Sequence, residues 1–199
     1  MMIDNFLHSN SFILASKSPR RKQILKMIGL NFQIIPSNYN ENQIPNITPQ
    51  ELVRIHSNGK AEYVAENQEN NFVIGSDTIV VIHNNILEKP KNRQDAFQML
   101  KTLSNQTHNV ITGYTVINSA NMKSISNTAI TKVTFYPLTY EVINHYLDHS
   151  TYIDKAGSYA IQDFSAVFIK IINGCFYNVM GFPISEFYQF VNHNFQKLL

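Results

Sequence analysis

Short runs of apolar residues alternate with capped helical segments along this chain, and this alternation constrains the fold more than any other feature. Phe12 to Ala15 is typical of a buried strand, and Ser18-Pro19 directly after it has the form of a helix N-cap with proline at the first helical position. Phe32 to Pro36 indicates a second strand. Thr48-Pro49-Gln50-Glu51 has the form of a capping box and predicts a helix to about Glu66. A mixed α/β fold is the consequence.

Two strand-like runs in the middle of the chain lie on either side of an acidic residue. Phe72 to Gly75 and Ile79 to Ile82 are rich in β-branched residues, and Ser76-Asp77-Thr78 separates them. Because aspartate is a common turn residue, we expect Asp77 to interrupt the strand. His83-Asn84-Asn85 has the composition of a hairpin turn, so a short return strand should follow.

The second half of the chain continues the mixture of helices and strands. Its apolar residues recur first at helical spacing and then at strand spacing. The expected elements are a helix over 93–103, strands over 109–118 and 124–135, a helix capped by Thr139, a strand over 166–172 and a final helix opened by Pro183.

Composition favours one domain with a substantial core. The chain has 199 residues, of which 44% are hydrophobic, and its thirteen Phe and ten Tyr supply large buried surfaces. No internal repeat and no linker rich in proline, glycine or serine occurs. We therefore expect one domain over residues 1–199, with at most two shallow lobes divided near residue 105.

Charge and cysteine content exclude several classes of function. The net charge is only +2 and no block of like charges occurs, which argues against a nucleic-acid partner. The lone Cys175 excludes an intrachain disulfide and indicates a reducing compartment. The N-terminus lacks the pattern of a signal peptide, and the most apolar later segment is interrupted by Lys170, so no membrane partner is expected. A cytoplasmic location follows.

The segment from Ser16 to Arg21 has the chemistry of a phosphate site. It places two hydroxyls and two guanidiniums where a predicted strand meets a helix N-terminus, whose free N–H groups and dipole favour an anion. Arginine adds forked donors that match phosphate oxygens. A capped helix with two solvated basic residues is an equally good interpretation of this segment alone.

Two acidic residues are candidates for chemistry. Asp77 lies between apolar runs, and a carboxylate buried there would have to bind a metal, accept hydrogen bonds or act as a base. A turn aspartate is the competing interpretation. Glu41 lies in a polar stretch, where metal ligation and simple solvation are both open.

Isolated polar residues complete the candidate set. Lys89 precedes a proline and Lys155 precedes Ala156-Gly157, so either lysine could direct a point charge at an anion or be a solvated loop residue. Gln162 could hold the edge of a base through its amide, or lie on the surface. His108 has no partner at metal-ligand spacing and is expected to be structural. Neither a P-loop nor a G-x-G-x-x-G motif occurs.

An ordered set of segments gives the chain a resemblance to a known family. The segments are LASKSPRRKQIL (14–25), VIGSDTIVV (73–81), EKP (88–90), LSNQTHNVITG (103–113), DKAGSYAIQ (154–162) and NVMGFPI (178–184). In this order they resemble the Maf family of nucleotide pyrophosphatases. The resemblance implies an inosine-triphosphatase-like α/β fold, with a mixed sheet, flanking helices and two lobes around a cleft. It also implies hydrolysis of a nucleoside triphosphate between its α and β phosphates, with Mg²⁺ or Mn²⁺ as cofactor.

The resemblance also implies roles for individual residues. Asp77 matches the family's catalytic acid, and Glu41 matches a loop acid near the metal, so these two carboxylates are the expected metal ligands. The implied substrate- and phosphate-binding residues are Ser16, Arg20, Arg21, Lys60, Lys89 and Lys155. The positions that match those for base preference are Arg20, Thr78 and Gln162.

The DKAGSYAIQ segment looks closer to the branch of the family that acts on dTTP and UTP than to the branch that acts on 7-methyl-GTP. Four positions depart from the usual pattern: Ser76 replaces Ala, Glu88 replaces Gly, Ala160 replaces Gly, and Asp163 replaces Gly. Glu88 and Asp163 each put a carboxylate near an expected anion site, so either could weaken triphosphate binding.

Other functions are left open by the sequence. One is a nucleotide-binding regulator of growth or cell division without hydrolysis. Another is the same chemistry on 7-methyl-GTP or another modified nucleotide. A protein that binds single-stranded nucleic acid would use the many aromatic residues, but this sequence lacks the basic groove that such binding requires. A homodimer is a reasonable expectation, because two-fold dimers are the commonest assemblies.

Overall fold

The computed structural model describes residues 10–42 and 44–199. Residues 1–9, which make up nearly all of the N-terminal segment that lacks a signal-peptide pattern, lie outside this part of the chain. The described strands are β1 (Phe12–Leu14), β2 (Phe32–Ile34), β3 (Phe72–Ile82), β4 (Asn85–Leu87), β5 (Thr107–Asn118), β6 (Ser124–Phe135) and β7 (Ile169–Asn173). The described α-helices are α2 (Pro19–Met27), α3 (Pro49–Ala65), α4 (Arg93–Leu103), α5 (Tyr140–His149), α6 (Phe176–Met180) and α7 (Ile184–Asn194). Three short 3₁₀ helices are η1 (Ala156–Ser158), η2 (Phe164–Phe168) and η3 (Phe195–Leu198).

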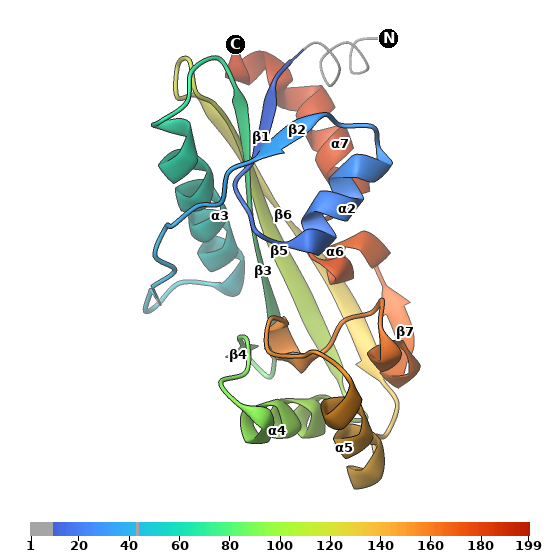
Figure 1. The fold of residues 1–199 in the computed structure, drawn as a ribbon. Coiled ribbons are helices and arrows are strands. Elements are labelled where there is room, and N and C mark those ends of the chain that lie inside the picture. The colour runs from blue at the N-terminus through green and yellow to red at the C-terminus, as the bar shows by residue number, and fades with distance from the viewer. Residues whose placement is uncertain (1–9, 43) are drawn as a thin grey trace. The chain divides into compact units, whose positions relative to one another are not determined.

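The strands form one mixed sheet in the order β2-β1-β3-β5-β6-β7, with β4 paired to β3 (Figure 1). β1 is parallel to both β2 and β3, and Phe12 lies beside Phe32 on one side and Phe72 on the other. β4 is antiparallel to β3, and β7 is antiparallel to β6. Parallel and antiparallel pairs with flanking helices confirm the predicted α/β class.

The chain divides into two compact units. Of the described residues, unit 1 comprises those within 10–42, 44–77, 112–129 and 181–199, and unit 2 comprises residues 78–111 and 130–180. The three long strands β3, β5 and β6 each contribute residues to both units. The boundary on β3 falls directly after Asp77.

In unit 1, helices cover both faces of the strands. α3 lies on one face, and α2 and α7 lie on the other (Figure 1). Alternation along β5 explains the two layers, because successive side chains of a strand point to opposite faces. Gly113 faces α3, whereas the Tyr114 ring packs against Phe187 and Phe190 of α7 at centroid distances of 5.6 and 5.8 Å.

The predicted caps of unit 1 are confirmed. The Ser18 side chain accepts a hydrogen bond from Arg21 N at the start of α2. Thr48 and Glu51 form the capping box of α3, since the Thr48 hydroxyl accepts from Glu51 N and the Glu51 carboxylate accepts from Thr48 N. Each cap satisfies N–H groups that have no partner inside the helix.

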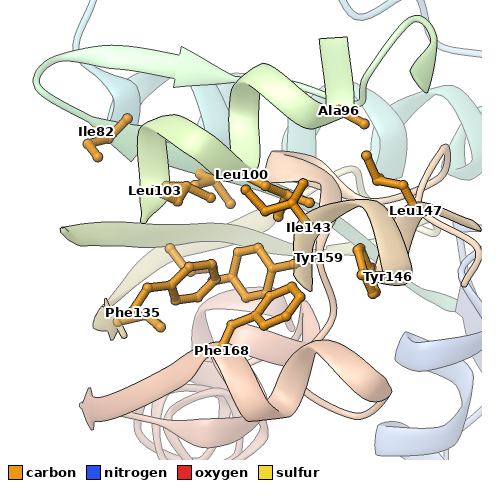
Figure 2. Packing of buried hydrophobic residues seen from close by; sticks show 13 residues of the cluster. Ile82, Ala96, Leu100, Leu103, Phe135, Ile143, Tyr146, Leu147, Tyr159 and Phe168 are labelled. Atoms are coloured by element: carbon orange, nitrogen blue, oxygen red, sulfur yellow. The ribbon is translucent and has the colours of Figure 1, made fainter. Parts of the chain in front are cut away.

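Unit 2 has its own hydrophobic core. Leu100 and Leu103 of α4 pack with Ile143 of α5 against the rings of Phe135 and Tyr159 (Figure 2). The Phe135 and Tyr159 rings meet edge to face at 4.9 Å, a geometry that aromatic quadrupoles favour. The apolar residues that recur at helical spacing in α4 and α5 therefore face this core.

The hairpin after β3 has the predicted turn. His83 and Asn84 both adopt positive φ, 48° and 65°, and Ile82 pairs with Asn85. A two-residue loop with this backbone matches the twist of its strands.

Two predictions about strands were wrong. Asp77 does not interrupt a strand, because β3 runs without a break from Phe72 to Ile82. The expected strand over 166–172 begins only at Ile169, since η2 occupies Phe164–Phe168. The short helix α6 was not predicted. Within residues 10–42 and 44–199, no helix is both long enough and apolar enough to cross a membrane.

Candidate active site

Two glycines bring α3 unusually close to the sheet of unit 1. A Cβ atom at Gly75 would lie 2.1 Å from the Ser57 carbonyl oxygen, and one at Gly113 would lie 2.3 Å from the Val53 carbonyl oxygen. Real Cβ atoms do not approach so closely, so the contact depends on the absence of both side chains. Hydroxyls link the same layers, since Ser57 Oγ lies 2.9 Å from Thr115 Oγ1.

The close approach of α3 places Lys60 beside Asp77. Gly75 and Asp77 are two residues apart on β3 and therefore point to the same face, the face covered by α3. Lys60 follows Ser57 by nearly one helical turn, and its ammonium donates to Asp77 Oδ1 at 2.7 Å. Lys60 and Asp77 are only 9% and 6% exposed, so the pair is shielded from water. Asp77 is therefore a buried, paired carboxylate and not a turn residue.

Glu41 joins this pair from the loop after β2. Its Oε2 atom lies 2.8 Å from Lys60 Nζ, so a single ammonium is shared by two carboxylates. The Glu41 side chain is 49% exposed, whereas that of Asp77 is 8% exposed. One carboxylate is thus buried in the sheet and the other faces solvent, with the cation between them.

The charges around Asp77 keep it ionised. Burial acts to raise the pKa of Asp77, but the Lys60 charge and hydrogen bond outweigh this effect, with help from Arg21 and His56. The pKa of Asp77 consequently lies below its ordinary value. At neutral pH the group is a carboxylate that accepts hydrogen bonds or binds cations.

The Ser16 to Arg21 segment forms a compact turn at the start of α2. Ser16 Oγ accepts from Arg21 Nη1 at 3.1 Å and from Ser18 N at 3.2 Å. Arg21 Nε donates to the Gly181 carbonyl at 3.0 Å, which fixes the guanidinium plane. The predicted phosphate residues Ser16 and Arg21 are therefore in contact with each other, and Arg20 is partly exposed beside them.

Arg21 belongs to the same electrostatic cluster as Asp77. Burial lowers the pKa of Arg21, and the negative charges of Asp77 and Glu41 oppose this shift. Arginine keeps its proton in proteins, so the guanidinium stays positive. Unit 1 thus brings Arg21, Lys60, Asp77 and Glu41 together in a cluster of two cations and two anions.

Unit 2 brings two other predicted segments together. Gly157 N donates to the Glu88 carbonyl at 3.1 Å, which places the segment of Lys155 beside that of Lys89. Gly157 has φ of 67°, a backbone conformation that glycine adopts without strain. The Lys89 side chain is exposed.

Lys155 has partners within unit 2. It is 6% exposed, and its ammonium donates to Asp163 Oδ2 at 2.5 Å and to the Thr151 carbonyl. Asp163 Oδ1 also accepts from Ser165 N at 2.9 Å and caps η2. Asp163, which stands where the family pattern usually has glycine, is therefore an internal counter-ion for Lys155. The predicted base-preference residues Gln162 and Thr78 also belong to unit 2, the first exposed and the second partly exposed.

His108 is structural, as expected. It is 1% exposed, its Nε2 atom lies 2.8 Å from Tyr159 OH, and its ring meets Phe135 edge to face at 5.0 Å. Burial lowers the pKa of His108 to about 4, so the ring is neutral at pH 7.

The sequence did not predict how the loop before Glu41 packs on α3. Tyr39 packs on Gly59 and lies close to His56, and neither contact was predicted. The sequence feature that could have indicated these contacts is Gly59. Glycine inside a helix is destabilising, so its presence suggests that another group packs closely against it. Among the described residues, no group of three or more His, Cys, Asp or Glu side chains is arranged to hold a metal.

Comparison with known proteins decides the family. The sequence matches the family described as Maf-like protein over residues 11–194. The chain belongs to the Maf-like protein family. Within it, the sequence is 42% identical over 176 residues to the dTTP/UTP pyrophosphatase of Carboxydothermus hydrogenoformans, covering 88% of this chain and 94% of that protein. It is 44% identical over 176 residues to the dTTP/UTP pyrophosphatase of Fusobacterium nucleatum, covering 88% and 91%.

The fold of this Maf-like chain is also found in a solved structure of low sequence identity. The Staphylococcus aureus Ham1 protein superposes with a TM-score of 0.54 at 13% identity, covering 93% of this chain and all of that one. At this identity the likeness concerns the fold alone.

Proposed function

We propose that this Maf-like protein is a nucleoside triphosphate pyrophosphatase that hydrolyses dTTP and UTP to the monophosphate and pyrophosphate. The observation that carries the proposal is the buried Lys60 ammonium held between Asp77 and Glu41. Binding alone has no need of a buried carboxylate held ionised by two cations, whereas hydrolysis of a phosphoanhydride does. The relatives named dTTP/UTP pyrophosphatase support the substrate class.

The proposed reaction begins with water attacking the α phosphorus. The bond between this phosphorus and the oxygen that bridges to the β phosphorus breaks, and the bridging oxygen leaves with pyrophosphate. The proton released by water passes to solvent or to a group near the site. Because the pKa of Asp77 is lowered, its main role is to orient the water through a hydrogen bond, and strong proton abstraction is secondary.

The positive groups of unit 1 are proposed to bind phosphates. Arg21 is held in a fixed plane by Ser16 and the Gly181 carbonyl, so its positive charge is oriented before substrate arrives. Charge placed in advance stabilises the negative charge that develops on a leaving oxygen. Arg20 and Lys60 add to this positive charge, and from unit 2 Lys89 and Lys155 are the further proposed phosphate-binding residues. Arg20, Thr78 and Gln162 are the residues proposed to set base preference.

A divalent cation, Mg²⁺ or Mn²⁺, is the proposed cofactor, with Glu41 and Asp77 as its protein ligands. The donor set fits, because both residues supply carboxylate oxygens and both already share one positive charge, that of Lys60. Mg²⁺ is usually held by one or two carboxylates together with substrate phosphates, so a third protein ligand is not required. When bound, the cation would neutralise phosphate charge and polarise the phosphoryl oxygens at the bond that breaks.

Two features of the setting belong to the same proposal. A protein of nucleotide metabolism with one cysteine and no basic block fits a cytoplasmic location without a nucleic-acid partner. A homodimer is proposed on the frequency of two-fold assemblies, and its measured mass in solution tests it.

The first test is release of pyrophosphate from dTTP, UTP, CTP, 7-methyl-GTP and purine triphosphates, with Mg²⁺ or Mn²⁺ and with chelator as control. We expect metal-dependent release that is fastest with dTTP or UTP. The Asp77→Asn variant keeps the shape but loses the charge that orients the water, and its turnover should fall about 10²-fold or more. A folded protein that binds these nucleotides without cleaving any would favour the regulator instead, and preference for 7-methyl-GTP would move the chain to the other branch.

A further inference from the structure

The loop that carries Glu41 is attached to α3 by a tyrosine. Residues 37–42 have no regular secondary structure, and they lie between β2 and α3. Within them, Tyr39 N donates to Ser37 Oγ at 2.9 Å. The Tyr39 ring contacts α3 at two positions.

The first contact is with Gly59, which has no side chain to obstruct the ring. A Cβ atom at this position would lie 2.3 Å from Tyr39 Cε2 and 2.5 Å from Cζ. The ring thus occupies the space that any other residue at position 59 would need. Glycine inside an α-helix destabilises the helix, and the contact with Tyr39 explains why glycine occupies position 59.

The second contact is with His56. Tyr39 OH lies 3.4 Å from His56 Nδ1, and the two rings meet edge to face at 5.8 Å. His56 is 5% exposed and so offers a fixed partner. His56, Gly59 and Lys60 lie on one face of α3, because residues three and four apart on a helix are neighbours. Tyr39 is therefore seated directly beside the lysine that Glu41 contacts.

Solvent exposure shows why Glu41 needs such an attachment. The Glu41 side chain is 49% exposed, so its own packing does not fix its position. Two residues before it, Tyr39 is anchored on α3, and Glu41 then reaches Lys60 Nζ at 2.8 Å. A surface carboxylate without this attachment would sample many positions and would meet Lys60 only part of the time.

We propose that Tyr39 is a positioning residue, seated on Gly59 and His56, that holds the Glu41 carboxylate against Lys60 before a substrate or cation binds. The loop acid is thereby preset for the divalent cation. This last step rests on the proposed function, whereas the anchoring of the loop does not. Tyr39 contacts neither substrate nor cation in this proposal and acts through Glu41.

The anchoring is tested by hydrogen exchange of residues 37–42 in the nucleotide-free protein. Tyr39→Ala and Gly59→Ala should each accelerate exchange severalfold in this segment, and Tyr39→Phe should keep most of the protection because it keeps the ring. Tyr63→Ala is the matched control, because Tyr63 is on the same helix but 43% exposed, and it should leave the loop unchanged. Unaltered exchange in both Tyr39→Ala and Gly59→Ala would overturn the proposal.

Gly59→Ala separates positioning from general stability. Replacing glycine by alanine inside a helix ordinarily stabilises it, so a purely structural interpretation predicts an equal or more stable protein with an unchanged loop. Displacement of Tyr39 predicts faster loop exchange despite the better helix former. The double variant Tyr39→Ala/Gly59→Ala should exchange no faster than Tyr39→Ala alone, because the second change then removes nothing. Additive effects would contradict the shared contact.

Binding of Mn²⁺ alone, measured by calorimetry, tests the link to Glu41. We expect Tyr39→Ala to weaken Mn²⁺ binding about 10-fold, as is common when a residue that orients a metal ligand is lost. In a Glu41→Gln background the same change should have no further effect. If Tyr39→Ala loosens the loop but leaves the Mn²⁺ affinity unchanged, Tyr39 still anchors the loop. The proposal that this anchoring presets Glu41 for the cation would then be wrong. If wild type and Glu41→Gln bind Mn²⁺ equally, Glu41 is not a metal ligand and the metal part of the proposed function fails.

Discussion

Single residues of the candidate site matter through the charges they are paired with. Asp77 is buried, and a buried carboxylate is tolerated only when it is paired or hydrogen-bonded. Here Lys60 supplies the pairing and is itself shared with Glu41. The cluster is therefore partly self-neutralised before any substrate enters. Binding a triphosphate would shift its cations from carboxylates to phosphate oxygens.

Asp163 offers a direct test of such an exchange of partners in unit 2. Its carboxylate lies 2.5 Å from Lys155 Nζ, so a phosphate would compete with this partner for the charge of Lys155. Asp163→Asn keeps an oxygen that can cap η2 but removes the charge. We expect the KM for dTTP to fall about 3- to 10-fold, with lower thermal stability and a similar kcat.

The matched variant for this test is Lys155→Met, which removes the cation and should raise the KM. Steady-state kinetics on both variants, with thermal unfolding alongside, separates the two roles of Asp163. A raised KM in Asp163→Asn would mean that Asp163 orients Lys155 for substrate and does not compete with it. An unchanged KM in both variants would remove Lys155 from the phosphate-binding set.

The residues of unit 1 were predictable as a set but not as an arrangement. Ser16, Arg21 and Asp77 lie in the segments that resemble the Maf family, and the same resemblance implies roles for Lys60 and Glu41 outside those segments. Their mutual contacts depend on how closely α3 approaches β3, and no local pattern encodes that distance. The pairing of Lys155 with Asp163 was likewise invisible, although the unusual carboxylate was noticed.

At the scale of elements, the close approach of α3 to β3 decides whether the site exists. Gly75 lies two residues before Asp77 on the face that meets α3, and the Ser57 carbonyl fills the place of its missing side chain. A methyl group here would meet backbone atoms, which move only with the whole helix. The Lys60 ammonium would then be withdrawn from Asp77.

Gly75→Ala should therefore lower the free energy of unfolding by at least about 2 kcal/mol, as overpacking commonly does, and should also reduce turnover. Ser76→Ala is the neighbouring control. Ser76 is fully buried on the same strand, and its Oγ has no hydrogen-bond partner among the described residues, so its loss should change stability by less than about 1 kcal/mol. Denaturant unfolding of both variants measures these changes. Similar free energies of unfolding for Gly75→Ala and Ser76→Ala would show that α3 can move away from β3 at little cost.

Element prediction was most accurate where caps and periodicity agreed. The α4 helix was predicted over Arg93 to Leu103 and has those bounds, and the capping box placed the start of α3. The failures occurred where tertiary contacts override local preference. Asp77 remains in a continuous strand because Lys60 compensates its charge, and residues 164–168 form a 3₁₀ helix because Asp163 caps it.

At the scale of the whole molecule, the two units carry different acid-sensitive groups. In unit 2, burial lowers the pKa of His108 to about 4. In unit 1, burial acts to raise the pKa of Asp77, but Lys60 and Arg21 outweigh it and hold the pKa below the ordinary value. Both groups make the folded state bind fewer protons than the unfolded chain, so both make stability fall as pH falls. The pH ranges of the two effects differ, because an unfolded histidine gains its proton near pH 6.5 and an unfolded aspartate near pH 3.9.

Acidification should consequently weaken unit 2 before unit 1. Between about pH 6.5 and 4 the unfolded chain protonates His108 while the folded protein does not, which removes about 3 kcal/mol of stability. The loss from Asp77 begins only below about pH 4. Hydrogen exchange at pH 7, 5.5 and 4.5 should show faster opening around His108 and Tyr159 while the strands beside Asp77 keep their protection. His108→Gln cannot titrate and should flatten this dependence in unit 2, even if it lowers stability at pH 7. Equal loss of protection in both units, unchanged by His108→Gln, would show that the chain opens as one cooperative body and that carboxylates other than Asp77 govern its acid sensitivity.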